Sequence, residues 1–168
     1  MARSDTPGHT LYDTRIDIPQ EARKELVALV NQQLADTADL HSQAKQAHWN
    51  VKGLQFQALH ELFDAVAAIL HGQVDALAER ATALGGVALG TVRQAAANSS
   101  LVESPADAVT GVDYLQALRD RLAAYAASTR AASRRAGELG DPTSEDLFIE
   151  ISHGADKYLY FLEAHLQA

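Results

Sequence analysis

Five potential metal ligands, two histidines and three carboxylates, lie close together in the chain. Four of them fall on one predicted helix, where successive side chains are about 100° apart. With His60 at zero, Asp64 lies at about 40°, Asp75 at about 60° and Glu79 at about 100°, so the four share one stripe. Asp64 and Asp75 are about 16 Å apart along the axis and cannot bind one ion. The fifth ligand is His48, on the preceding helix.

The spacing of the four helix ligands is symmetric, because 60 and 79 have the same sum as 64 and 75. A two-fold axis crossing the helix between residues 69 and 70 sets the first two ligands of one chain opposite the last two of an antiparallel copy. With His48, two imidazoles and three carboxylates then meet at each end of the interface. Such a set suits iron or manganese better than a closed structural zinc site. The alternative interpretation is a solvated face that carries these residues by chance.

The helix that carries this stripe is predicted from about Gln55 to Leu84 and is ended by Gly85 and Gly86. Its ligand stripe points roughly 140° away from its apolar stripe, so the ligands do not face the chain's own core. The residues on the ligand side near the proposed axis are small, namely Ala65, Ala68, Gly72 and Ala76. The apolar stripe comprises Leu59, Phe63, Val66, Leu70, Leu77, Ala81 and Leu84.

The run KQAHWNVKGLQFQALHELFD, followed by DALAERATALGG, resembles the signature of the Dps family, the mini-ferritins. The pattern H-x11-H-x3-D-x10-D-x3-E matches at every ligand position, and the similarity extends from about Leu26 to Leu166. The resemblance implies an all-α, ferritin-like four-helix bundle with a long crossover between its second and third helices. It also implies a homo-oligomer, a dodecameric hollow shell built from two-fold dimers.

The resemblance further implies a ferroxidase that oxidises Fe(II) at centres shared between subunits, with hydrogen peroxide preferred to oxygen. Ferric mineral would be stored in the shell and protect against oxidative damage. Trp49 would lie beside the iron site and intercept radicals, although a large interface anchor is an equally compatible role. Lys45 is expected to pair with a carboxylate near the centre. The implied catalytic and iron-binding residues are His48, His60 and Asp64 of one subunit with Asp75 and Glu79 of its partner.

Composition restricts the alternatives. The 168 residues suffice for one domain, and the absence of cysteine excludes disulfides and thiolate metal sites. The beginning of the sequence has no apolar segment typical of a secretory signal, and no run is long enough to span a membrane. We therefore expect a cytoplasmic protein, with the nucleoid as the alternative location. A formal net charge of −8 favours cations over phosphate backbones as partners.

Prolines and glycines, which start and end helices, divide the chain into a flexible tail, residues 1–18, and a bundle domain, residues 19–168. Pro19 precedes a first helix that runs to about Asn50, and a short helix is expected in the crossover. The third helix is expected to be capped by Ser104 or Asp107 and to run to about Gly137. The short crossover helix is placed at Thr91–Asn98, and the fourth long helix runs from Thr143, after Pro142, to about Leu166.

The apolar faces of the last two helices are predicted from their spacing. On the third helix they are Leu115, Leu118, Leu122, Tyr125 and Ala132. On the fourth they are Leu147, Ile151, Leu159, Leu162 and Leu166. Glu150 and His153 form an E-x-x-H motif, which ferritin-like di-iron proteins carry twice inside the bundle. Because the second helix has no matching motif, we interpret this one as coincidence.

Three further sets of residues have open assignments. By the resemblance, Asp120 and, less directly, Asp113 would line a pore through which iron reaches the cavity, although a solvated helix face is the alternative. His9 and Asp13 would form an accessory metal site or be incidental to the tail. His41 is expected to be a hydrogen-bonded interface histidine rather than a ligand.

Two other functions compete with the ferroxidase. One is a DNA-compacting nucleoid protein with little ferroxidase turnover. Direct DNA binding is doubtful, because the tail contains no lysine and is near neutral. The other is a structural, metal-bridged dimer without turnover.

Overall fold

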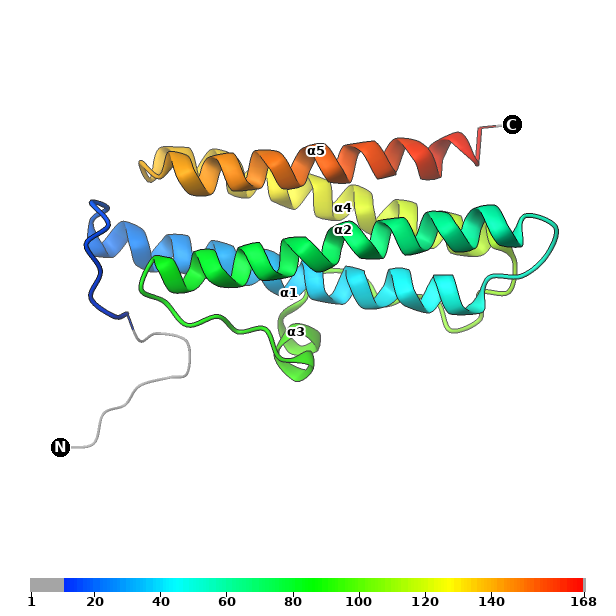
Figure 1. The fold of residues 1–168 in the computed structure, drawn as a ribbon, viewed down its shortest axis with the longest axis horizontal. Helices are drawn as coiled ribbons and strands as arrows, with labels where there is room; N and C mark the ends of the chain where they lie inside the picture. Colours follow the sequence, from blue (N-terminus) through cyan, green and yellow to red (C-terminus); the bar gives the residue numbers. More distant parts are fainter. Residues whose placement is uncertain (1–10, 168) are drawn as a thin grey trace.

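The computed structural model describes residues 11–167, which form five helices and no strand. Four long helices run along the length of the molecule, and a short one, α3, stands apart from them in the crossover (Figure 1). This arrangement confirms the predicted all-α fold with a short helix between the second and third long helices. The helices are α1 (Gln20–Asn50), α2 (Phe56–Ala83), α3 (Val92–Asn98), α4 (Gly111–Glu138) and α5 (Pro142–Ala164).

The long helices pack as two hairpins, α1 with α2 and α4 with α5. The crossover returns along the bundle from the end of α2 to the start of α4 (Figure 1). Glycines with positive φ make the tight turns: Gly53 (φ 103°) lies between α1 and α2, and Gly85 (φ 86°) follows α2. Among the described residues, none of the helices combines the length and apolar character that crossing a membrane requires.

The core follows the predicted apolar stripes of α2 and α4, all of whose members are buried. The stripe of α5 differs from the prediction. Leu147 and Leu159 are only partly buried, and Leu166 lies beyond the helix end. Ile151 and Leu162 are buried as predicted, and Phe148 and Ala155 join them, because spacings of three, four and seven residues keep to one side of a 3.6-residue helix.

The start of α4 also differs from the prediction, since neither Ser104 nor Asp107 caps it. Thr110 occupies the N-cap, and its side chain accepts a hydrogen bond from the backbone N–H of Asp113. The Asp113 carboxylate accepts the Thr110 N–H in return, at 2.7 Å, which completes a capping box. The Ser104 hydroxyl instead donates to Gln43 of α1, so this part of the crossover stays extended along the bundle.

The buried Asp36 of α1 holds the crossover in place. Its carboxylate accepts the backbone N–H of Ser100 at 2.6 Å and the Ser100 hydroxyl at 3.1 Å. The described part of the tail is attached as well. Tyr12 donates its N–H to the carbonyl of Gly85, and its own carbonyl accepts a hydrogen bond from the Arg23 side chain at 3.3 Å. Two buried helix side chains, Asp36 and Arg23, thus help to hold the crossover and the tail.

Candidate metal centre

The hairpin of α1 and α2 brings His48 and His60 together. His48 lies in the last turn of α1, and His60 lies near the start of α2. The short connection through Gly53 sets the two helices antiparallel, so that the imidazoles stack with ring centres 3.7 Å apart and planes 23° apart. Residues twelve positions apart in the sequence therefore meet face to face.

Each histidine is held by the backbone of the other. Nδ1 of His48 lies 2.8 Å from the carbonyl oxygen of His60, and Nδ1 of His60 lies 2.8 Å from the carbonyl oxygen of His48. A carbonyl oxygen only accepts, so both Nδ1 atoms must carry the hydrogen. In the neutral ring, Nε2 then keeps its lone pair, which is the tautomer that binds metals. The two side chains thus have fixed orientations, and each neutral ring keeps an unbonded Nε2.

Asp64 lies one turn after His60, and its Oδ1 is 4.0 Å from Nδ1 of His48, too far for a hydrogen bond. The Lys45 Nζ lies 2.7 Å from Asp64 Oδ1, which confirms the prediction that this lysine pairs with a carboxylate. The hydrogen bond from Lys45 lowers the pKa of the Asp64 carboxyl, and the positive charge of Lys45 lowers it further. Asp64 is therefore a charged, solvent-exposed carboxylate at neutral pH.

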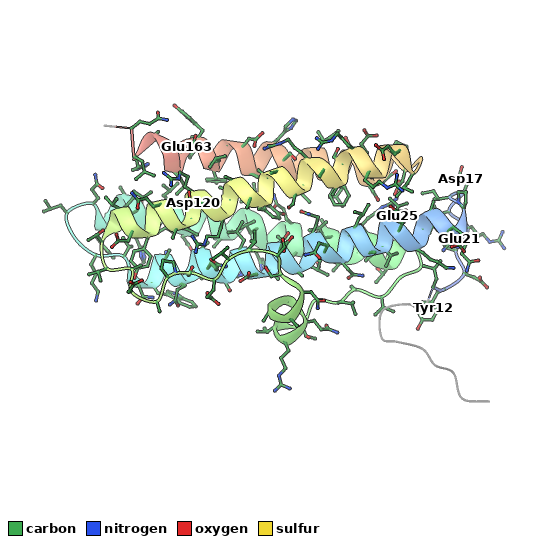
Figure 2. All side chains as sticks on the ribbon, turned by 180° about the vertical axis from the view of Figure 1, so that it is seen from behind. Tyr12, Asp17, Glu21, Glu25, Asp120 and Glu163 are labelled. Carbon is green, nitrogen blue, oxygen red and sulfur yellow. The ribbon has the colours of Figure 1, made fainter. Side chains whose placement is uncertain are left out.

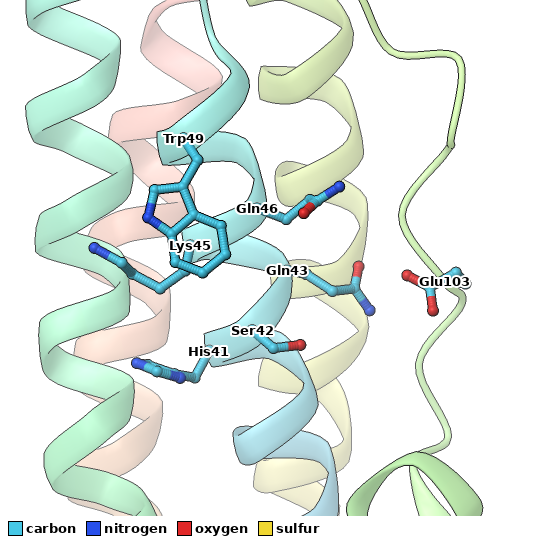
Figure 3. A pocket seen from close by; sticks show the side chains of 7 residues that line it. All are labelled: His41, Ser42, Gln43, Lys45, Gln46, Trp49 and Glu103. Atoms are coloured by element: carbon cyan, nitrogen blue, oxygen red, sulfur yellow. The ribbon is translucent and has the colours of Figure 1, made fainter. Parts of the chain in front are cut away.

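Trp49 is next to this cluster and points away from the core. Its side chain is 67% exposed, which is unusual for the largest apolar side chain. The ammonium group of Lys45 lies 5.9 Å from the centre of its ring, and the two residues are neighbours in Figure 3. An exposed indole beside ligand side chains fits both sequence interpretations, a radical acceptor and an interface anchor.

Asp75 and Glu79 do not reach this cluster. Both are exposed, and Asp75 follows Asp64 by eleven residues on the same straight helix, which is about 16 Å. Within residues 11–167, no group of three or more His, Cys, Asp or Glu side chains is close enough to hold an ion. The α2 surface between the two ligand sets is open, and Ala68 and Gly72 are exposed on it. One chain therefore presents two separated partial ligand sets on one accessible face.

Known proteins resemble this chain over nearly its whole length. The family described as ferritin-like domain matches residues 27–168. A DNA protection during starvation protein of Agrobacterium fabrum is 40% identical over 156 residues, which cover 93% of this chain and 96% of that protein. The chain belongs to the Dps family. Members of this family have ferritin-like subunits, so the Dps resemblance seen in the sequence is confirmed.

Solved Dps structures superpose closely on this chain. DpsA14 from Streptomyces coelicolor is 32% identical with a TM-score of 0.90, covering 96% of this chain and 95% of that one. Dps from Microbacterium arborescens, in a high iron form, is 33% identical with a TM-score of 0.83, covering 94% and 99%. The resemblance therefore holds for the whole bundle, including both helices that carry the ligands.

The two aspartates assigned to a Dps pore have different surroundings. Asp120 is exposed on α4, at the end of the bundle far from Tyr12 and Asp17 (Figure 2), and pairs with Arg119 at 2.7 Å. Asp113 is committed to the N-terminus of α4, where hydrogen bonds from the backbones of Thr110 and Val109 lower its pKa. The role of Asp113 in the capping box was not predicted, although the T-x-x-D spacing from Thr110 to Asp113 indicates it.

Three other sequence assignments concern histidines. Glu150 and His153 are both exposed on α5, so the E-x-x-H motif has no place in the bundle interior. His9 lies outside the described residues, so the accessory site proposed with Asp13 stays a prediction. His41 makes no hydrogen bond within residues 11–167, and its ring centre lies 5.7 Å from that of His71; its role at an interface stays a prediction. His71 was not singled out from the sequence, although it lies about 20° from His60 on the ligand stripe.

Proposed function

We propose that this Dps chain is the subunit of a ferroxidase mini-ferritin, which oxidises Fe(II) and stores ferric mineral inside a dodecameric shell. The observation that carries the proposal is the reciprocal pairing of His48 and His60, which leaves both Nε2 atoms free to bind an ion. Imidazole nitrogens combined with carboxylate oxygens hold Fe(II) and leave positions open for an oxidant. The membership of the chain in a ferritin-like family supports the same reading.

The ligand set becomes complete when two copies pair about a two-fold axis. His48, His60 and Asp64 would come from one copy, and Asp75 and Glu79 from the second. The open, small-residue surface of α2 supports this pairing, since exposed Ala68 and Gly72 let two helices approach closely. Each dimer would then hold two equivalent centres, one at each end of the α2 pair.

The reaction requires little of the protein beyond binding and orientation. Fe(II) is the substrate, and two ions give one electron each to hydrogen peroxide, whose O–O bond breaks to leave two hydroxides. The carboxylates stabilise the more highly charged Fe(III) product, which hydrolyses and moves to acidic groups on the cavity wall. Lys45 keeps Asp64 oriented through their 2.7 Å contact. Trp49 would supply an electron to any radical formed by one-electron reduction of peroxide.

The direct test combines particle size with oxidation kinetics. We expect the purified protein to elute as a large assembly and to consume about one peroxide for every two Fe(II) ions, with a ferric absorbance that rises many times faster than in buffer. Turnover separates an enzyme from a metal-bridged structural dimer, which would bind Fe(II) stoichiometrically and stop. An oxidation rate equal to that of protein-free buffer would disprove the ferroxidase.

DNA binding is the second candidate function, because several relatives are named DNA protection during starvation protein. The net charge of −8 and the absence of lysine from residues 1–18 oppose direct contact with phosphates. We therefore expect no mobility shift of duplex DNA at about 0.15 M salt. A shift without added cations would contradict this, whereas a shift that requires a divalent cation would identify metal bridging between acidic protein and DNA.

Asp120 and Asp113 complete the proposed route of iron. Asp120 is the better candidate for a pore, because its exposed carboxylate pairs with no residue other than the neighbouring Arg119 in the described part of the chain. Carboxylates repeated around a symmetry axis would attract Fe(II), most strongly at low salt. Asp113 would contribute charge while its oxygen remains bonded to the helix N-terminus.

A further inference from the structure

A second pair of histidines lies on the same two helices as the candidate centre. His41 of α1 and His71 of α2 have ring centres 5.7 Å apart and ring planes 42° apart. Figure 3 shows the His41 side chain extending from α1 toward α2. His41 is partly buried and His71 is exposed, so the pair is open to solvent on one side.

The ring nitrogens of His41 and His71 make no contact that stabilises the described part of the fold. Within residues 11–167, neither ring makes a hydrogen bond, whereas the rings of His48 and His60 each bond to a carbonyl. The nitrogens of His41 are not among the buried side-chain atoms that lack a partner within these residues, so they reach solvent. Two adjacent imidazoles with free nitrogens are therefore available to bind something that accepts two lone pairs.

The separation of the rings fits one shared metal ion. A metal–nitrogen bond of about 2.0–2.1 Å, plus about 1.1 Å from nitrogen to ring centre, puts each ring centre about 3.2 Å from the ion. Two such arms span the observed 5.7 Å when the angle at the ion is about 125°. A small side-chain rotation brings this angle to the tetrahedral value.

We propose that His41 and His71 form a second metal site, which binds a borderline divalent ion such as Zn²⁺ through two imidazoles and completes its coordination with water. Imidazole ligands suit zinc, copper and nickel, whereas carboxylate-rich sites suit harder ions. No aspartate or glutamate joins the pair to form a three-ligand group within residues 11–167. The site therefore differs in chemistry from the carboxylate-rich candidate centre.

The new site also differs in position. His41 precedes His48 by seven residues, or about 10 Å along α1, so the two sites share no ligand. Lys45 lies one turn from His41, and its charge opposes a bound cation, but its salt bridge to Asp64 offsets that charge. Both ligands come from one chain, so the proposal does not depend on the two-fold pairing. In that pairing, position 71 faces position 68 of the second copy, an alanine that leaves room for the ion.

Calorimetric titration with Zn²⁺ tests this site independently of iron oxidation. The assembled wild-type protein is compared with His41→Gln and His71→Gln, and with His153→Gln as a control at an exposed histidine on α5. Zinc bound at His48 and His60 contributes equally to all four, so the difference isolates the new site. We expect each of the first two variants to lose one bound ion per chain or to bind it at least about tenfold more weakly. Loss of a residue that only supports a metal ligand already weakens metal affinity by about tenfold or more, so loss of a ligand should weaken it at least as much. The control should match the wild type.

Visible absorption of bound Co²⁺ provides the second readout, since loss of an imidazole changes the ligand field in both variants but not in the control. Equal Zn²⁺ stoichiometry and affinity in all four proteins would overturn the proposal. Loss in only one of the two variants would also overturn it, because it would mean a one-histidine site. Size exclusion shows whether each variant assembles. His71 is exposed in the single chain, so His71→Gln should not impair folding of the subunit, and it still tests the site if His41→Gln fails to fold. If the protein did not oxidise Fe(II) but still bound zinc through His41 and His71, the proposed function would be refuted and the second metal site would stand.

Discussion

Reassembly of two inactive variants is expected to restore about one ferroxidase site in four. The first variant replaces His60 and Asp64 with alanine, and the second replaces Asp75 and Glu79. Each alone should be nearly inactive, because every shared site lacks two of its five ligands. After unfolding and equal mixing, random pairing makes about half of the dimers mixed, and in a mixed dimer one site inherits both defects while the other inherits neither.

This result depends on the separation of the ligand sets along α2. If one chain supplied a whole centre, every site would carry one defect and mixing would recover nothing. Mass spectrometry of the reassembled particle verifies that both variants are present, and each variant refolded alone is the matched control. Mixed particles that oxidise Fe(II) no faster than the separate variants would exclude a site shared across the two-fold axis.

Replacement of Asp141 by alanine is expected to lower the free energy of unfolding by about 3–5 kcal/mol, the cost of leaving a buried charge without its partner. Asp141 is 1% exposed, and both of its carboxylate oxygens accept hydrogen bonds from Arg80 Nη2, at 2.8 and 2.7 Å. The same carboxylate accepts the backbone N–H groups of Thr143 and Ser144 and so caps α5. Its loss removes the cap and leaves the guanidinium of α2 unpaired.

The matched control for Asp141 is Asp156→Ala on the same helix. Asp156 pairs with Arg130 at 2.7 Å, but both side chains are about half exposed, so its loss should cost at most about 1 kcal/mol. Urea unfolding at one fixed protein concentration measures both variants, because assembly makes stability depend on concentration. An Asp141 variant as stable as the Asp156 variant would show that the buried pair contributes little.

The same carboxyl predicts an acid limit to stability. Burial raises the pKa of Asp141, but the hydrogen bonds from Ser144 and Arg80 outweigh it, so the net pKa lies below its usual 3.8. Folding thus favours the ionised form. The corresponding stability is complete above the pKa of the unfolded chain and is lost as the pH falls through the lower folded pKa. In Asp141→Asn, this part of the acid sensitivity should be absent.

Helix boundaries were predictable where a single residue, through its own backbone conformation, starts or ends the helix. Pro19 before α1, Gly85 after α2 and Pro142 at the start of α5 act through their own backbone dihedrals, so no distant residue needs to be known. The start of α4 was not predictable in this way. Ser104 and Thr110 are both capping residues, and only the fold reveals that Gln43 of α1 occupies the Ser104 hydroxyl.

The sequence by itself determined that four potential ligands share one face of α2 and that they are too far apart for one ion, because helical rise and rotation are properties of the backbone alone. Only the tertiary structure decided what these side chains meet. The tautomers of His48 and His60 depend on carbonyl groups across a hairpin, and the His41–His71 pair joins helices at positions thirty residues apart. Such contacts depend on how two helices dock, and docking is set by the packing of the whole core rather than by the period of either helix.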